Sequence, residues 1–491
     1  MRKKMYAVLA ISIIFMAVFP SLAFSDGNTR SYDYAYDFWQ VPTESVPAFV
    51  LERIIDRDTL PGLTIGGFDD VYCGGGKLFL IDTAESRLNI LDDSLELMAS
   101  VRLLYMEDGR IAMDEKSRQI VLTNPEGVFY HELTNEIYVA DTGAWRILIL
   151  DGDRFFLKRV IERPENMTGV TEFKPSKITV DRTNRIYIVV QSGYEGLIEL
   201  IEDGSFSRYY GVNKPKVNLL DHFWKVFATN EQREKMAKIF APAFNNIDID
   251  EDGFIYATTY DANSEAKVFR LNPKGENVLI QSKDQPVEGD FYFRANNQNQ
   301  FVAAAVNDYG VYAVLDRGMR RIFIYNFYGE MISIINYPPG TKGSFTVPTG
   351  IAWFGEKLIA TDKQLRLAYV YSMTDFGRLA MGSARYYHQG EWEESARLLE
   401  AALRLNSNYN LAYSGIGKHY LMQDDFEDAM YYLKLGQNRS FYSKAYNQFR
   451  NQWVKDNFIW FALFFLAVIG LVIYTEVKFH KKGDAKNEAS A

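Results

Sequence analysis

Residues 128–151 read VFYHELTNEIYVADTGAWRILILD, and this stretch decides the fold that the sequence predicts. It contains a short apolar strand, a polar turn, a second strand rich in Ile, Tyr and Val, a loop and a third strand. The same order recurs at 178–200 (ITVDRTNRIYIVVQSGYEGLIEL) and at 247–271 (IDIDEDGFIYATTYDANSEAKVFRL). A unit that recurs every few tens of residues is typical of repeat architectures.

Three further copies lie at 71–91, 301–325 and 351–371, so the chain contains six units. Six matching positions mark the end of the second strand: Asp82, Asp141, Gln191, Thr259, Asp316 and Asp362. They lie 46 to 68 residues apart, which fits one four-stranded sheet per unit with loops of variable length. Such sheets bury both faces when they are arranged radially. The sequence therefore predicts a mainly β protein with a six-bladed β-propeller over residues 45–375.

The closure of the ring can also be predicted. The last unit has three clear strands before residue 372, and a strand-like segment, VPAFVLERII (46–55), precedes the first unit. Pairing this segment into the last blade leaves no open sheet edge. We expect the N-terminal strand to complete the sixth blade.

Both ends of the chain resemble membrane-targeting segments. A basic, an apolar and a small-residue stretch follow one another in residues 1–25, which is the order of a secretory signal peptide. Residues 457–475 are predicted to be a transmembrane helix, because 458–475 contain no charged side chain. A basic flank follows in 476–491, and such flanks favour the cytoplasmic side. The predicted topology is a single-pass protein of the cell membrane with a linker at 26–44, extracellular domains and a cytoplasmic tail.

Composition and motifs exclude several classes of function. The net charge is −9, with no basic cluster outside the two membrane flanks, which argues against nucleic acid as a partner. Cys73 is the only cysteine, so no disulfide can form within the chain. The five histidines are scattered, and neither H-E-x-x-H nor G-x-S-x-G occurs. We therefore expect no enzymatic activity and no cofactor.

Three of the six units share a further pattern. Asp82, Asp141 and Asp316 each end a strand and are followed five residues later by an arginine. This pattern resembles the NHL repeat, which implies a propeller that binds proteins, RNA or sugars. We expect each Asp–Arg pair to be an ion pair that braces the loop between strands two and three.

An insertion at 216–242, with two predicted helices, separates the third unit from the fourth. In a propeller this connection lies on the same face as the loops between strands two and three. It is either a packed hairpin that fills a gap or a lid over a binding site. The candidate ligand-binding residues on this face are Trp145, Tyr194, Tyr260, Arg317, Gln364 and, in the insertion, Trp224.

A second resemblance concerns metal chemistry. Glu126-Gly127 is similar to the Glu-Gly segment of the SMP-30 gluconolactonase family, and Asn245 lies in a segment similar to the family's Asn-Gly-Leu-Asp. The resemblance implies a metal-dependent lactonase with Glu126 and Asn245 as ligands. The family's third ligand is replaced here by Thr349, and two ligands hold a divalent ion poorly. We therefore expect no metal.

A different period follows the propeller. Segments 382–405 and 416–436 align at an offset of 34 residues and resemble two tetratricopeptide repeats. A further apolar helical face lies at 441–453. The sequence predicts a small helical domain over 376–453, which is either a spacer above the membrane or a peptide-binding groove.

The predicted function is that of a membrane-anchored extracellular binding or interaction module, with a protein partner or a glycan on the propeller face. Its layout resembles that of bacterial proteins that accompany sugar-uptake ABC transporters, which implies an accessory role in carbohydrate uptake. A metal-dependent lactonase and a structural envelope scaffold are the alternatives.

Overall fold

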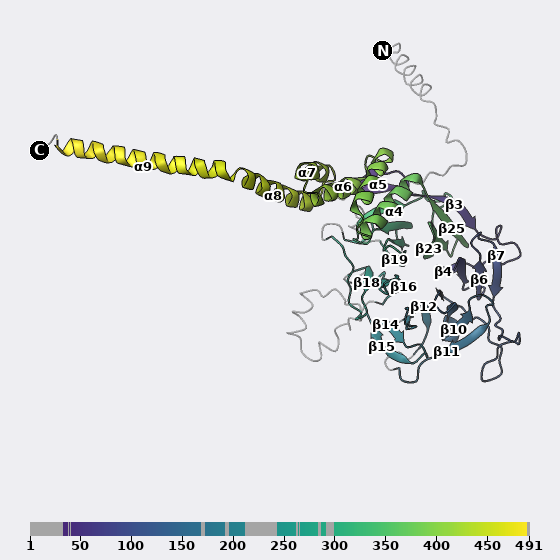
Figure 1. Cartoon of the computed structure of the whole chain (residues 1–491). Coiled ribbons are helices and arrows are strands. Elements are labelled where there is room, and N and C mark those ends of the chain that lie inside the picture. The colour runs from purple at the N-terminus through teal and green to yellow at the C-terminus, as the bar shows by residue number, and fades with distance from the viewer. Residues whose placement is uncertain are drawn as a thin grey trace, which may run out of the picture.

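The computed structural model describes residues 33–37, 39, 41–167, 172–191, 196–211, 243–261, 264, 266–282, 286–290 and 299–488. Within these ranges, six β-sheets form a ring, a two-stranded hairpin lies against it, and six helices follow (Figure 1). The prediction of a six-bladed propeller is confirmed. The predicted signal peptide (1–25) and the insertion (216–242) lie outside the described residues.

Each blade is an antiparallel sheet of strands that are consecutive in the chain, except the sixth. The first blade consists of β4 (Phe68–Gly74), β5 (Lys77–Asp82), β6 (Arg87–Leu91) and β7 (Leu97–Val101). The second consists of β8 (Gly127–His131), β9 (Glu136–Asp141), β10 (Arg146–Asp151) and β11 (Leu157–Ile161), with the 3₁₀ turn η1 (Thr142–Ala144) between β9 and β10. The third consists of β12 (Pro175–Val180), β13 (Ile186–Val190), β14 (Leu197–Leu200) and β15 (Phe206–Tyr210).

The fourth blade has three strands within the described residues. These are β16 (Asn246–Ile249), β17 (Ile255–Thr258) and β18 (Val268–Leu271). The fifth blade consists of β19 (Phe301–Val306), β20 (Tyr312–Asp316), β21 (Arg321–Tyr325) and β22 (Met331–Ile335). The sixth consists of β23 (Pro348–Phe354), β24 (Lys357–Asp362), β25 (Leu367–Met373) and β3 (Phe49–Ile55).

The first strands of successive blades lie side by side around the axis, in the order β4, β8, β12, β16, β19, β23 and back to β4. The apolar cores lie between neighbouring blades, as the radial arrangement requires. The ring is closed by β3, which pairs antiparallel with β25, so that Ile55 lies opposite Ala368 and Phe49 opposite Met373. The predicted closure is confirmed.

The aspartates at the ends of the second strands hold each blade together. Asp82, Asp316 and Asp362 each accept a hydrogen bond, at 2.6–2.9 Å, from a backbone N–H sixteen residues earlier, just before the first strand of the same blade. All three side chains are fully buried. A buried carboxylate that binds backbone N–H groups ties the start of one strand to the end of the next.

The expected Asp–Arg ion pairs form in only one of the three units. Arg146 Nε lies 2.8 Å from the carboxylate of Asp141. The other two arginines pair elsewhere, Arg87 with Glu85 (3.5 Å) and Arg321 with Asp290 (2.6 Å). The prediction was wrong for these two units. Backbone N–H groups bind both oxygens of Asp82, but only Oδ1 of Asp316, whose Oδ2 is buried without a hydrogen-bond partner in the described structure.

The segment expected to be a linker contains a folded hairpin. Strands β1 (Tyr34–Tyr36) and β2 (Pro42–Glu44) pair with each other, and β1 lies against β22. The hydroxyl of Tyr34 donates a 2.7 Å hydrogen bond to Asp290. This part of the chain therefore belongs to the folded body.

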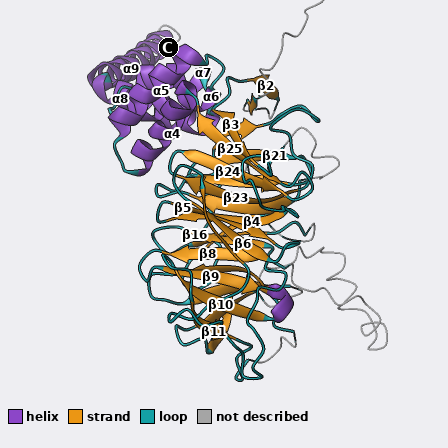
Figure 2. Cartoon of the chain, turned by 90° about the vertical axis from the view of Figure 1, so that its right-hand side faces the viewer, coloured by secondary structure: helices purple, strands orange, loops and turns teal. Residues whose placement is uncertain are grey.

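Six helices follow the propeller: α4 (Asp375–His388), α5 (Trp392–Leu405), α6 (Asn410–Met422), α7 (Phe426–Leu435), α8 (Arg439–Asp456) and α9 (Phe458–Glu488). Helices α4 to α7 gather beside one edge of the propeller (Figure 2). Phe376, Leu399 and Tyr409 belong to the same apolar core as residues of blades five and six. The helical unit and the propeller therefore share one hydrophobic core.

Helices α8 and α9 extend away from the propeller as an arm (Figure 1). Within α9, the segment Phe458–Lys478 is long and apolar enough to cross a membrane, and none of it is buried against the rest of the chain. It coincides with the transmembrane helix predicted at 457–475.

Candidate functional site

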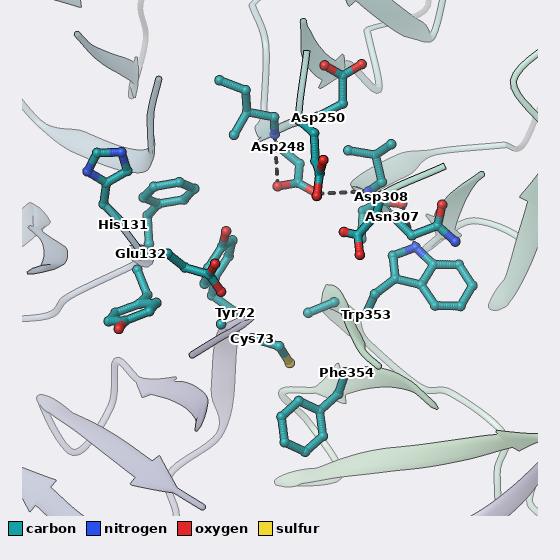
Figure 3. A pocket seen from close by; sticks show the side chains of 18 of the residues that line it. Tyr72, Cys73, His131, Glu132, Asp248, Asp250, Asn307, Asp308, Trp353 and Phe354 are labelled. Carbon is teal, nitrogen blue, oxygen red and sulfur yellow. Dashed lines mark hydrogen bonds between the residues drawn. The ribbon is translucent and has the colours of Figure 1, made fainter. Parts of the chain in front are cut away.

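A cavity of about 720 Å³ lies on the propeller axis. Its walls come from the first strands of all six blades, and it opens between the turns that follow these strands (Figure 3). We call it the funnel, and its mouth is formed by residues 74–76, 131–133, 181–182, 250–251, 253, 307–309 and 354–356. Small-molecule pockets have volumes of roughly 300–1,000 Å³, so the funnel is large enough for a ligand.

Strand direction explains where the funnel opens. Neighbouring strands of each blade are antiparallel, so the turns between strands one and two of every blade lie at one end of the axis. The loops between strands two and three lie at the other end. The funnel therefore opens at the end of the axis opposite to the loops that carry the candidate ligand-binding residues.

An ion pair links the first and third blades deep in the funnel. Lys177 Nζ, from β12, lies 2.6 Å from Asp70 Oδ1, from β4, and both side chains are nearly buried. The other oxygen of Asp70 accepts a 3.0 Å hydrogen bond from the backbone N–H of Val128. Burial raises the pKa of Asp70, and Lys177 opposes that shift. Gly127, in β8, allows β8 and β12 to lie close together, because a Cβ at this position would lie 2.3 Å from the carbonyl oxygen of Ser176.

Asp248 is the carboxylate on the wall of the funnel, in β16. Its oxygens accept hydrogen bonds from the backbone N–H groups of Ile249 and Val306, both at 2.9 Å. Burial raises the pKa of Asp248 to about 7, against the effect of these two N–H groups, and the charges of Asp250 and Asp70 add to the rise. Asp248 therefore titrates near neutral pH.

Aromatic rings form part of the wall. Tyr72 and Phe129 are in contact, with ring centroids 4.7 Å apart, and Phe354 lines the funnel from β23, next to the strand of Tyr72 (Figure 3). The indole of Trp353 also lines the cavity, and it donates a 3.1 Å hydrogen bond to the carbonyl of Ala305. The funnel thus combines apolar ring surface with a few polar groups, as ligand sites generally do.

Carboxylates surround Tyr72. Burial raises the pKa of its phenol well above the usual value, and the charges of Asp248, Glu132 and Asp308 contribute in the same direction. These side chains come from three different blades and surround one space in Figure 3. Burial and the charge of Asp248 also raise the pKa of the Cys73 thiol, so the thiol is protonated at neutral pH.

The helical unit contributes one residue to the mouth. Arg385, in α4, lines the funnel, and its guanidinium lies 5.9 Å from the ring centroid of Tyr309, in the turn between β19 and β20. The mouth is therefore built by both the propeller and the helices.

The structure brings four of the six candidate ligand-binding residues to the opposite end of the axis. They lie in loops between strands two and three: Trp145, Tyr260, Arg317 and Gln364. Trp145 is 44% exposed and Tyr260 is 58% exposed. The side chains of Arg317 and Gln364 are exposed as well. Tyr194 and Trp224 lie outside the described residues.

The two metal-ligand candidates make hydrogen bonds within the protein. The carboxylate of Glu126 accepts two from Gln191, at 2.7 and 2.9 Å, and the amide of Asn245 donates to the carbonyl of Val302 at 2.7 Å. Thr349 Oγ1 donates to the carbonyl of Phe68. Over the ranges that the structure describes, no three His, Cys, Asp or Glu side chains gather closely enough to hold a metal ion.

Sequence reasoning missed the funnel because each blade contributes only a few residues. Five turns after a first strand carry an acidic residue at the mouth: Glu132, Asp181, Glu251, Asp308 and Glu356. This regularity was visible in the sequence. Acidic residues are common in exposed turns, however, so it did not by itself indicate a site.

No protein-family profile matches the sequence, and no curated protein matches it. Solved structures are similar in fold. Virginiamycin B lyase from Staphylococcus aureus is 13% identical and aligns over 66% of this chain and 100% of its own, with a TM-score of 0.39. The β-propeller domain of Myceliophteria thermophila Cps50 (Swd1) is 11% identical, with the same coverage and TM-score. Kuenenia stuttgartiensis hydrazine synthase is 11% identical over 64% of this chain and 97% of its own, with a TM-score of 0.33. Likeness at this level carries no argument about activity.

Proposed function

We propose that this protein is a membrane-anchored binding module whose ligand enters the funnel. One observation carries the proposal: the cavity on the axis has walls from all six blades and combines aromatic rings with carboxylates. Binding energy in such a cavity comes from the buried ring surface, and the polar groups fix the orientation of the ligand. Arg385 places the helical unit at the edge of the same site.

The anchoring part of the proposal rests on α9 and on the two ends of the sequence. The apolar segment Phe458–Lys478 supports a single membrane span. The signal-like residues 1–25 and the basic residues after the span support an outer propeller and an inner tail. Protease added to intact cells should then degrade the propeller and leave a tag after Ala491 intact. Protection of the propeller would refute this orientation.

The opposite end of the axis remains available for a second contact. The exposed rings of Trp145 and Tyr260 suit a protein partner or a glycan, since aromatic rings provide large contact areas. An accessory role beside a sugar-uptake ABC transporter is the partner hypothesis that we would test, by pull-down of the tagged chain from native membranes. Loss of the captured partner in Trp145→Ala would support this contact.

The funnel is tested by charge reversal at its mouth. Glu132 and Asp308 are exposed turn residues, so Glu132→Arg and Asp308→Arg should leave the fold intact. A library of metabolites and glycans is screened by thermal shift on the full chain in detergent. We expect ligands of the wild-type protein to lose their effect in both variants and to keep it in Trp145→Ala. If the ligands instead keep their effect in the two charge-reversal variants and lose it in Trp145→Ala, the binding site lies at the other end of the axis.

A further inference from the structure

The charged groups of the funnel do not balance. Four of its carboxylates are paired with cations: Asp70 with Lys177, Asp181 with Arg185, Asp250 with Arg270 and Glu251 with Arg182. Within the part of the chain that the structure describes, four others form no ion pair: Glu132, Asp248, Asp308 and Glu356. Against them stands one cation that lines the funnel without a carboxylate partner, Arg385, which lies over the ring of Tyr309. The funnel therefore has an excess of negative charge.

Asp248 is one of the carboxylates of the funnel that have no counter-ion. Two backbone N–H groups bind its oxygens, and no lysine or arginine of the described chain reaches it. A partly buried carboxylate without a counter-ion disfavours its own ionisation. A cation in the funnel would supply the missing charge.

The aromatic wall is an independent feature that selects the kind of cation. The rings of Tyr72 and Phe129 lie beside the space that Asp248 and Asp308 border, and Phe354 lines the same funnel from β23, the strand next to that of Tyr72. Aromatic faces attract ammonium and guanidinium groups through the negative charge density of the ring face. Inorganic ions gain little from such rings, whereas organic cations gain both the electrostatic attraction and the buried area.

One neutral polar side chain beside the carboxylates also has an unsatisfied atom, but that atom is a donor, and an ammonium or guanidinium group cannot accept from it. The side-chain amide nitrogen of Asn307 is buried and donates no hydrogen bond within the described structure, while its oxygen accepts from the backbone N–H groups of Tyr309 and Val311. Asn307 lines the funnel. An unsatisfied buried donor is costly, and a ligand atom that accepts a hydrogen bond would satisfy it.

We propose that the funnel recognises an organic cation, an ammonium or guanidinium group that lies between Asp248, Asp308 and the ring of Tyr72. This inference rests on the proposed function and specifies its ligand class. The group belongs either to a free small amine or to a basic side chain of a partner protein. The same chemistry serves both sources, and the experiment below separates them.

Other ligand classes fit the funnel less well. An anion would meet four carboxylates without ion pairs. A divalent metal ion would need several ligands at about 2.0–2.6 Å, and the described residues offer no such group. A neutral sugar could stack on the same rings, but it would leave the four unpaired carboxylates without a counter-ion.

The proposal predicts that binding depends on pH. A bound cation favours the ionised form of Asp248. At pH values where Asp248 is protonated, cation binding therefore releases the proton. The ionisable groups that face Asp248 or line the same funnel are Asp70, Tyr72, Cys73, Tyr130, His131, Glu132, Lys177, Asp181, Arg182, Asp250, Glu251, Tyr256, Asp308, Tyr309, Glu356 and Arg385. Affinity should rise about five- to tenfold from pH 6 to pH 8, as the ionised fraction of Asp248 grows.

The test uses agmatine, which has a cationic group at each end, and its neutral analogue N-(4-hydroxybutyl)urea. Titration calorimetry is carried out on the full chain in detergent at fixed ionic strength. We expect agmatine to bind at least tenfold more tightly than the neutral analogue at pH 8. Asp248→Asn should weaken agmatine at least tenfold at pH 8 and remove the pH dependence, and Asp308→Asn, at an exposed turn, should weaken it severalfold.

The matched control is Asp252→Asn. Asp252 lies in the turn between β16 and β17 and does not line the funnel, so this change removes the same charge nearby and should alter affinity less than twofold. If Asp252→Asn lowers the affinity for agmatine as much as Asp248→Asn does, agmatine is attracted by the negative surface in general, and the proposal is overturned. Equal binding of both probes would also overturn it. An arginine-containing pentapeptide that binds tenfold more tightly than agmatine would assign the cation to a protein partner, whereas the reverse would assign it to a small amine.

The two proposals can fail separately. If a neutral ligand from the library binds and Asp308→Arg abolishes its effect, the funnel is a ligand site and the cation inference is wrong. If ligands respond only to Trp145→Ala, the funnel itself is not the site, and both proposals fall.

Discussion

The ammonium of Lys418, in α6, lies 2.7 Å from the carboxylate of Glu330, in the turn between β21 and β22 of the propeller. The side chain of Lys418 is 8% exposed. The ion pair therefore links the helical unit to the fifth blade from within their interface. Its strength depends on both partners, because a buried charge without its partner is costly.

Aromatic contacts surround this ion pair. Lys418 Nζ lies 5.0 Å from the ring centroid of Phe441, in α8, and 5.7 Å from that of Tyr387, in α4. Tyr387 in turn contacts Tyr328 of the propeller turn. Three helices thus hold one turn of the fifth blade, and α4 also carries Arg385 to the mouth of the funnel. The contacts of α4, α6 and α8 thus connect the mouth of the funnel with the start of the arm.

Replacing Lys418 should loosen the junction. We expect Lys418→Ala to lower the free energy of unfolding by about 2 kcal/mol or more, since Glu330 is left partly buried without a counter-ion. The measurement is urea unfolding of the full chain in detergent, followed by tryptophan fluorescence. Arg397→Ala, which breaks an exposed pair with Glu394 in α5, is the control and should change stability by less than about 0.5 kcal/mol. Similar losses in both variants would contradict a buried junction.

Two glycines of α4 test the packing at the same junction. A Cβ on Gly377 would lie 2.0 Å from the backbone carbonyl oxygen of Ala48, so Gly377→Ala should destabilise the protein by about 3 kcal/mol. A Cβ on Gly382 would approach only the methyl group of Leu398, at 3.1 Å, which can move. Gly382→Ala should therefore be neutral or slightly stabilising, because alanine favours helix. A stable Gly377→Ala protein would show that the helices do not dock closely.

The aspartates at the strand ends should matter more than the arginines that follow them. Asp82 is fully buried and accepts hydrogen bonds from the backbone N–H groups of Gly66 and Glu85. Asp82→Ala leaves both donors without a partner and should cost about 2–4 kcal/mol. Arg87→Ala breaks only a pair with Glu85 and should cost less than about 1 kcal/mol. Thermal unfolding of the two variants compares them directly. Equal losses of stability would mean that Arg87 stabilises the blade as much as Asp82 does.

The fold was predictable because it follows from repetition and alternation. Each unit repeats strand, turn and strand, and an isolated sheet with two apolar faces needs neighbours on both sides. The missing strand of the last unit and the spare strand at 46–55 then had one sensible pairing, which the pairing of β3 with β25 confirms. The partners of Arg87 and Arg321 were not predictable, because they depend on loop geometry that sequence spacing does not determine.

The site was harder to predict for a geometric reason. Tyr72, Asp248 and Asp308 are separated by long stretches of sequence and meet only because the first strands converge on the axis. Each looks like an ordinary strand or turn residue in its own unit. Exposed aromatic residues such as Trp145 stand out in the sequence and directed attention to the other end of the propeller. Whether a partner binds there stays a prediction.

Asp248 should give the stability of the protein a distinctive pH dependence. Its pKa is about 7 in the folded chain, above the value of about 3.9 expected for an unfolded chain. Between pH 4 and pH 7 the folded state therefore holds a proton that the unfolded state has released, so the free energy of unfolding falls as the pH rises through this range. Above pH 7 both states are ionised and the contribution is constant. Asparagine cannot ionise, so Asp248→Asn should lack this decline.

We expect the stability of Asp248→Asn relative to the wild type to increase by a few kcal/mol from pH 4.5 to pH 8, since one pKa unit corresponds to about 1.4 kcal/mol. Other buried carboxyl groups, such as Asp70 and Asp250, remain in both proteins, so the difference isolates Asp248. Urea unfolding at a series of pH values provides the measurement, with Asp252→Asn as the control. Parallel curves for the wild type and Asp248→Asn would mean that folding does not raise the pKa of Asp248, and the predicted pH dependence of cation binding would then be absent.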